Sequence, residues 1–151
     1  YSIESGYVSR INISHWGYGK AIYIDHPNGY TSVYAHLDHF PEKIEKIIRK
    51  EQYNLKTETL TYYLDSLAIK VEEGEVIAYS GNTGGSSGPH LHFEIRETVS
   101  EHPINPQLFN FSIPDNKSPI IDKLKLYVFD RFFPDYMDYG RYITMMRKHQ
   151  P

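Results

Sequence analysis

The sequence predicts a mainly β protein: an antiparallel β domain with a small two-helix insertion, followed by the start of a second β domain. Three observations support this fold class. Short segments rich in Ile, Val, Tyr and Thr alternate with turn signals at the beginning of the chain. A stretch with helical spacing of isoleucine and leucine follows, and a linker rich in Pro, Asp and Asn precedes another alternating segment.

The first third of the chain is expected to form three strands, at residues 6–13, 20–25 and 30–36. The last two are separated by an Asn28-Gly29 step, which tolerates the positive φ angles of a tight hairpin. Side chains alternate along a strand. We therefore expect Tyr34 and His36 on a common face of the third strand.

From Pro41 the apolar period becomes helical. We expect two short helices joined near Asn54, with Pro41 opening the first and Thr57 capping the second. Because this segment, about 41–69, interrupts a β domain, it is interpreted as an insertion. Packing on the sheet as surface decoration and a role in binding a substrate or partner both stay open.

Sheet structure is expected again at 75–79 and at 90–96. The residues between them are too rich in Gly and Ser to form anything but a loop. Along the second of these strands four polar side chains share one face: His90, His92, Glu94 and Arg96. Residues 112–119 have linker composition, and 120–151 would begin a second, β-rich domain whose first strand is 120–129.

Composition restricts the classes of function. The 151 residues include 16 basic and 19 acidic side chains and carry a formal charge of −3, which argues against an electrostatic grip on nucleic acid or on an anionic membrane. The absence of cysteine excludes disulfides, thiol nucleophiles and cysteine-ligated zinc. Neither a phosphate-binding Gly-x-x-x-x-Gly-Lys motif nor a Gly-x-Ser-x-Gly nucleophile motif is present.

The histidines are the strongest candidates for chemistry. His90 and His92 project to the same side of one strand, within reach of one metal ion or one substrate atom, although a half-exposed strand face carrying two histidines is the plainer alternative. His36 also ends a strand, so three imidazoles could line one groove. The remaining histidines lie in or beside turn-like segments and are expected to be exposed: His15, His26, His39, His102 and His149.

Four stretches occur in the same order as in a known family. They are residues 18–30, Tyr34-Ala35-His36-Leu37, Gly81-Asn82-Thr83-Gly84, and Ser87-Gly88-Pro89-His90-Leu91-His92-Phe93-Glu94-Ile95. Together they resemble the lysostaphin/LytM-type zinc metallopeptidases, which are peptidoglycan endopeptidases. The resemblance runs from about residue 6 to about residue 109, leaves 41–69 as an insertion, and places a LytM-like domain at 1–111.

The resemblance implies an antiparallel β domain with a long groove and a zinc ion held by three protein ligands. His92 would be one ligand, and His36 and His90 would line the groove as catalytic residues. The other two ligands would come from a His-x-x-x-Asp motif, which this chain does not contain. We therefore expect an N-terminally truncated fragment that binds zinc poorly and is inactive alone.

The activity that the resemblance implies is zinc-dependent hydrolysis of peptide cross-links or bridges in bacterial peptidoglycan. A zinc-bound water would be the nucleophile, and the two groove histidines would assist. Substrate contacts are expected at Tyr34, Asn82, Gly84 and Ser87, with a packing role equally open for Tyr34. The protein would act in the periplasm, in the cell envelope or as a secreted protein. Peptidoglycan peptides are the expected partner, nucleic acid is not, and an envelope protein partner and the oligomeric state stay open.

Two alternatives to an active enzyme remain. Some proteins with this fold are catalytically inactive LytM-like binding modules that activate a cell-wall amidase, but these usually lose zinc ligands or groove histidines. His36, His90 and His92 are all present here, which favours the enzyme. Alternatively, the helical insertion could plug the groove as an autoinhibitory element.

Overall fold

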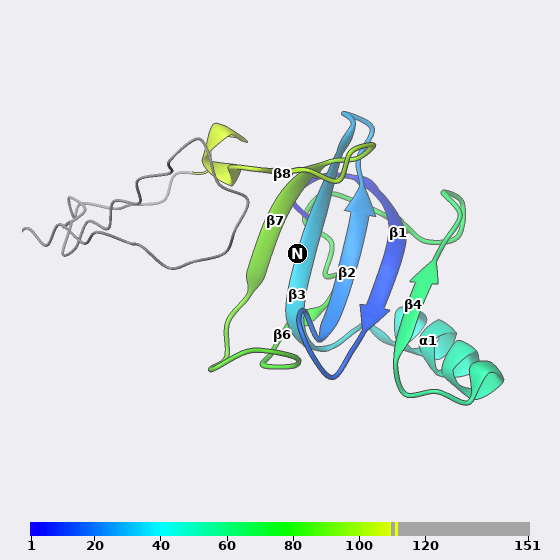
Figure 1. Cartoon of the computed structure of the whole chain (residues 1–151). Coiled ribbons are helices and arrows are strands. Elements are labelled where there is room, and N and C mark those ends of the chain that lie inside the picture. Colours follow the sequence, from blue (N-terminus) through cyan, green and yellow to red (C-terminus); the bar gives the residue numbers. More distant parts are fainter. Residues whose placement is uncertain (110, 112–151) are drawn as a thin grey trace, which may run out of the picture. The chain divides into compact units, whose positions relative to one another are not determined.

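The computed structural model describes residues 1–109 and 111, which form an eight-stranded antiparallel sheet with one α-helix (Figure 1). These residues belong to a compact unit that spans Tyr1–Ser112. The elements are β1 Gly6–Ile13, β2 Lys20–Asp25, β3 Tyr30–His39, α1 Glu42–Leu55, β4 Leu60–Tyr63, β5 Lys70–Val71, β6 Tyr79–Ser80, β7 His92–Glu97, β8 Pro103–Ile104 and a 3-10 turn at Pro106–Phe109. The predicted linker at 112–119 and the predicted strand at 120–129 lie outside the described residues.

The sheet order is β4-β1-β2-β3-β7-β8, with β5 also paired to β1 and β6 to β3. The β1–β2–β3 meander confirms the three strands predicted from the first third of the sequence, and the bounds of β1 and β2 agree with the prediction. The long connection after β3 allows the distant strand β7 to pair with it, so that Ala35 lies opposite His92.

The main core lies between one face of this sheet and α1. Its fully buried side chains come from the central strands, from α1 and from the segments that follow it: Val8, Ile11, Ile22, Ile24, Leu37, Ile44, Ile48, Val71 and Ile77. The helix forms because Ile44, Ile47 and Ile48 recur at helical spacing and supply an apolar stripe. It ends at Leu55, and the left-handed conformation of the next residue, Lys56, terminates the helical hydrogen bonding.

The prediction of a second helix after Asn54 is wrong. Leu60–Tyr63 is strand β4, which pairs with β1. Thr and Tyr are residues that favour strands, and the edge of β1 offers a backbone partner that a helix would leave unused. The helical spacing of Leu60, Tyr63 and Leu67 misled the prediction, because Tyr63 and Leu67 are exposed. Thr57 therefore caps no second helix; its hydroxyl donates to Thr59 O.

The strand predicted at 75–79 is also wrong for most of its length. Only Tyr79 belongs to a strand, the short β6, although Ile77 is buried in the core. Glu75 is held in a turn, where its carboxylate accepts the Glu72 N–H and pairs with Lys43 of α1. Within the described part of the chain, no helix is long and apolar enough to span a membrane.

Replacing Ile48 with alanine should lower the free energy of unfolding by about 2–5 kcal/mol, because Ile48 is 1% exposed and its loss leaves a cavity between α1 and the sheet. Urea denaturation of the purified chain measures this change. Tyr53→Ala on the same helix is the matched control: Tyr53 is 82% exposed, so a change within about 0.5 kcal/mol is expected. Equal effects of the two substitutions would contradict the packing of α1 on the sheet.

Candidate functional site

Three histidines come together on the sheet face opposite to α1. The ring centroid of His36, in β3, lies 4.8 Å from that of His90 and 5.5 Å from that of His92. His36 is buried, His90 is exposed at the end of the Gly-rich loop, and His92 is half-buried at the start of β7. Residues separated by more than fifty positions in the sequence thus form one cluster of imidazoles.

A bulge in β3 brings His36 to this cluster. The pairing of β2 with β3 shifts by one residue between Ile22↔Tyr34 and Lys20↔Leu37. His36 occupies the extra position with φ +58°, and its N–H donates to Tyr18 O at 3.0 Å. A left-handed conformation is uncommon for a residue other than glycine, and it turns the side chain away from simple strand alternation.

The expectation that Tyr34 and His36 share a face is therefore wrong. Tyr34 pairs with Phe93 and packs into the main core, where its hydroxyl accepts a hydrogen bond from Ile3 N–H. Burial raises the pKa of this hydroxyl above its usual value. His36 instead lies near His92, on the face of Ala35. The structure places Tyr34 apart from the cluster, in the packing position that the sequence left open.

The Gly-rich loop after β6 holds His36 in place. Thr83 O accepts a hydrogen bond from His36 Nδ1 at 2.8 Å, and the Thr83 hydroxyl accepts from Lys20 N–H and donates to Leu37 O. The loop also contacts the β1–β2 turn closely: a Cβ atom added to Gly84 would lie 2.3 Å from Gly19 N. Glycine is thus required at Gly84, which has φ +74°.

Two predicted substrate contacts, Asn82 and Ser87, are exposed on this same loop. Gly84 lies between them and is half-buried against the β1–β2 turn. The loop follows the short strand β6 and leads directly into His90, whose N–H donates to Gly81 O. Asn82 and Ser87 therefore lie on the segment that joins β6, which pairs with β3, to His90 and His92.

The hydrogen bonds of the three imidazoles assign their protons. A carbonyl oxygen only accepts, so Nδ1 of His36 donates to Thr83 O and Nδ1 of His90 donates to Gly88 O at 2.8 Å. Among the described residues, Nε2 of both rings has no hydrogen-bond partner. In His92 the pattern is reversed, because Nε2 lies 2.5 Å from Glu94 Oε1 and Nδ1 is the nitrogen left free.

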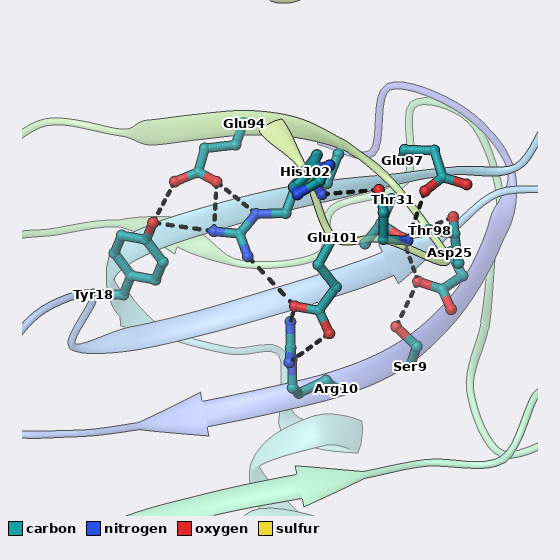
Figure 2. A network of polar contacts seen from close by, with 12 residues as sticks. Ser9, Arg10, Tyr18, Asp25, Thr31, Glu94, Glu97, Thr98, Glu101 and His102 are labelled. Atoms are coloured by element: carbon teal, nitrogen blue, oxygen red, sulfur yellow. Dashed lines mark hydrogen bonds and ion pairs between the residues drawn. The ribbon is translucent and has the colours of Figure 1, made fainter. Parts of the chain in front are cut away.

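Glu94 belongs to a polar network across this face of the sheet (Figure 2). It accepts hydrogen bonds from the Tyr18 hydroxyl at 2.5 Å and from Arg96 Nε at 2.7 Å. Burial opposes ionisation of Glu94, but the hydrogen bonds from Tyr18, His92 and Arg96 outweigh it and hold the pKa of Glu94 below its usual value. The hydrogen bond to Glu94, followed by burial, raises the pKa of Tyr18.

The network continues away from the histidines. Arg96 also approaches Glu101, and Glu101 pairs with Arg10, whose guanidinium lies 3.8 Å from the centre of the Tyr23 ring. The Arg10 hydrogen bond lowers the pKa of Glu101. Strand alternation had placed Glu94 and Arg96 on the face of His92. The contributions of Tyr18, Arg10 and Glu101 carry no signal in sequence spacing, because Arg10 lies in β1, Tyr18 in the β1–β2 turn and Glu101 in the β7–β8 connection.

Of the five other histidines, His26 departs from expectation. It is 7% exposed, with Nδ1 near Ser5 O and Nε2 near the Ser32 hydroxyl, so both ring nitrogens have partners. His26 is therefore a buried structural residue. His15, His39 and His102 are exposed as expected, and His149 lies outside the described residues.

The imidazole nitrogens of the cluster are atoms that zinc binds, but the described residues do not supply the three ligands that a catalytic zinc site needs. Zinc in proteins is held by imidazole, thiolate and carboxylate groups, and a catalytic site takes three of them. Among residues 1–109 and 111, no three His, Cys, Asp or Glu side chains are arranged to hold a metal ion. His92, with Nδ1 free and Nε2 on a carboxylate, has the surroundings typical of a zinc-binding histidine.

The helix α1 does not cover the histidine cluster. Its buried residues Ile44 and Ile48 pack in the core on the opposite face of the sheet. The helix therefore does not plug the histidine cluster in this structure; it packs on the sheet, and a role of α1 in binding a substrate or partner stays a prediction.

Comparison with known proteins gives a consistent result. Residues 57–106 match the family model for peptidase family M23. The chain is 38% identical over 90 residues to the DD-carboxypeptidase/endopeptidase Mpg of Neisseria meningitidis, covering 60% of the chain and 15% of that protein. It is 34% identical over 87 residues to the peptidoglycan DD-endopeptidase ShyA of Vibrio cholerae, covering 58% of the chain and 14% of that protein. The chain thus spans about 15% of the length of these relatives.

Among solved structures, the catalytic domain of lysostaphin from Staphylococcus simulans is similar, with a TM-score of 0.50 and 24% identity over 72% of this chain and 66% of that domain. A likeness at this level of identity shows the fold. It confirms the mainly antiparallel β, LytM-like domain expected from the sequence.

Proposed function

We propose that this chain belongs to peptidase family M23 and forms part of a zinc-dependent endopeptidase that hydrolyses peptide cross-links or bridges of bacterial peptidoglycan. The observation that carries the proposal is the cluster of His36, His90 and His92, in which one ring has Nδ1 free and two have Nε2 free. The printed names of Mpg and ShyA support the substrate class.

In this proposal His92 is one zinc ligand, through Nδ1. The described residues do not supply the full set of three, so the remaining ligands are taken to lie outside them. The chemistry that a bound zinc ion supplies is Lewis-acid activation of water and of the scissile carbonyl. The chain alone, with a single ligand, should bind zinc weakly and be inactive.

His36 and His90 handle protons and the developing negative charge. With Nδ1 protonated and held by a backbone carbonyl, Nε2 of each ring carries the lone pair that can accept a proton. Once protonated, the same nitrogen can donate to an oxyanion or to the leaving amine. His36 is buried and fixed by Thr83, whereas His90 is exposed and can exchange its proton with solvent.

The substrate would approach along the loop that carries Asn82, Gly84 and Ser87. Asn82 and Ser87 offer exposed polar groups for the backbone of an extended peptide. A loop rich in glycine at this position would leave room for a slender peptide with small side chains. Because peptidoglycan lies outside the cytoplasm, we place the protein in the periplasm, in the cell envelope or among secreted proteins, with peptidoglycan peptides as its partner.

Metal removal tests this function. A protein that extends this chain with its natural upstream sequence should retain zinc when purified without chelator, and it should release soluble muropeptides from purified peptidoglycan. Treatment with a chelator should abolish release, and added zinc should restore it. The 151-residue chain is the control and should do neither. A metal-free extended protein would contradict the proposal, whereas retained zinc without hydrolysis would favour the amidase-activating module.

A further inference from the structure

We infer that Glu94 is the positioning residue for His92: with Tyr18 and Arg96, it holds the proton of His92 on Nε2 and thereby keeps Nδ1 free as the metal-binding atom. The inference deepens the proposed function, since it rests on His92 as a zinc ligand. It begins from the short contact between His92 Nε2 and Glu94 Oε1, at 2.5 Å.

The donors around Glu94 decide where the proton lies. Arg96 has only N–H donors, and it directs two of them to Glu94 Oε2, with Nε at 2.7 Å and Nη2 at 2.6 Å. Arg96 Nη2 also donates to the Tyr18 oxygen at 3.1 Å, so the Tyr18 hydroxyl proton is available for Glu94 Oε1, 2.5 Å away. Both carboxylate oxygens of Glu94 therefore act as acceptors.

The contact with His92 then has only one consistent assignment. A carboxylate that accepts from Arg96 and Tyr18 also accepts from the imidazole, so His92 Nε2 must carry the hydrogen. The neutral ring has its lone pair on Nδ1. His36 and His90 have the opposite tautomer, because their Nδ1 atoms donate to carbonyl oxygens. Glu94 is thus what distinguishes His92 from its two neighbours.

The surroundings make this arrangement rigid. The side chains of Glu94 and Arg96 are only 15% and 16% exposed, and the Tyr18 ring lies 4.9 Å from the His92 ring. Tyr18 is also fixed through its backbone, since its carbonyl accepts the His36 N–H. Tyr18 therefore contacts Glu94 through its side-chain hydroxyl and the β3 bulge at His36 through its backbone carbonyl. Figure 2 shows Tyr18 and Glu94 directed toward one another.

Nitrogen-15 NMR of the metal-free 151-residue chain at alkaline pH tests the assignment without zinc or hydrolysis. We expect the Nε2–H tautomer for His92 and the Nδ1–H tautomer for His36. Glu94→Gln should raise the Nδ1–H fraction of His92 several-fold, because glutamine has one acceptor oxygen where Glu94 has two and Arg96 competes for it. Glu101→Gln is the matched control: it alters the same network at Arg96 without contacting His92 and should leave the His92 signals unchanged.

In the extended protein, Glu94→Gln should weaken zinc affinity by about 10–100-fold, and Glu101→Gln should not. If Glu94→Gln fails to fold, Glu94→Ala removes the acceptor altogether and should shift the tautomer ratio in the same direction. A His92 proton on Nδ1 in the wild-type chain, or a tautomer ratio unaffected by both Glu94→Gln and Glu94→Ala, would overturn the inference. If the tautomers do not shift, the inference about Glu94 fails and the peptidase proposal still stands. If the tautomers are as expected but the extended protein is free of metal, the peptidase proposal fails and the proton assignment of His92 still stands.

Discussion

In the extended protein, substitutions in the three histidines should divide into two classes. His92→Ala should lose zinc and hydrolysis together. His36→Asn and His90→Ala should keep zinc and lower kcat on purified peptidoglycan by about 10²–10⁴, the range for a positioned acid–base or oxyanion-stabilising group. The division follows from the free nitrogens: Nδ1 in His92, and Nε2 in the other two. Zinc content by mass spectrometry and rates of muropeptide release, measured on the same samples, check both parts.

Asparagine is the informative replacement at His36. Its amide N–H can still donate to Thr83 O, and asparagine tolerates the positive φ of the bulge, so the fold is preserved while the Nε2 position is lost. His102→Ala, which removes an exposed histidine outside the cluster, is the control and should leave both readouts unchanged. Unchanged hydrolysis in His36→Asn and His90→Ala would remove the catalytic roles assigned to these residues.

Strand positions with regular alternation were predictable from the sequence. β1 and β2 agree with prediction because β-branched and aromatic residues between turn signals leave few alternatives. Helix α1 was also predictable, since three isoleucines define its buried stripe. The strand β4 was not, because its pairing with β1 depends on a free edge that only the assembled sheet reveals. Local periodicity cannot report a long-range partner.

The candidate site was predictable as a set of residues but not as a geometry. Alternation predicted His90 and His92 together, and both lie beside His36, although β7 begins only at His92 and His90 is held by an isolated bridge to Gly81. His36 joins them only because a bulge reverses the alternation expected from its distance to Tyr34, and a bulge leaves no periodic signal in the sequence. The roles of Tyr18 and Glu94 likewise depend on which donors surround a carboxylate, and sequence spacing contains no such information.

Because the Gly-rich loop contacts the β1–β2 turn so closely, replacing Gly84 should strongly lower the free energy of unfolding. In Gly84→Ala the new Cβ would lie 2.3 Å from Gly19 N and 2.5 Å from Gly17 O, both backbone atoms that cannot move aside cheaply. We expect a loss of about 1–2 kcal/mol of unfolding free energy from the positive φ, and about 1–3 kcal/mol more from the clash. The displaced loop would also take Thr83 O away from His36, so hydrolysis in the extended protein should fall together with stability.

Gly74→Ala separates the two causes. Gly74 has the same φ of +74°, but a Cβ there would meet nothing within 4 Å. It should therefore show only the conformational part of the destabilisation and keep its hydrolysis rate, since the Gly74 N–H bonds to Ser2 O and an added Cβ would touch nothing. Urea denaturation of both variants gives the difference directly. If Gly84→Ala destabilised the chain no more than Gly74→Ala, the loop would not be clamped against the β1–β2 turn, and the fixed orientation of His36 would need another cause.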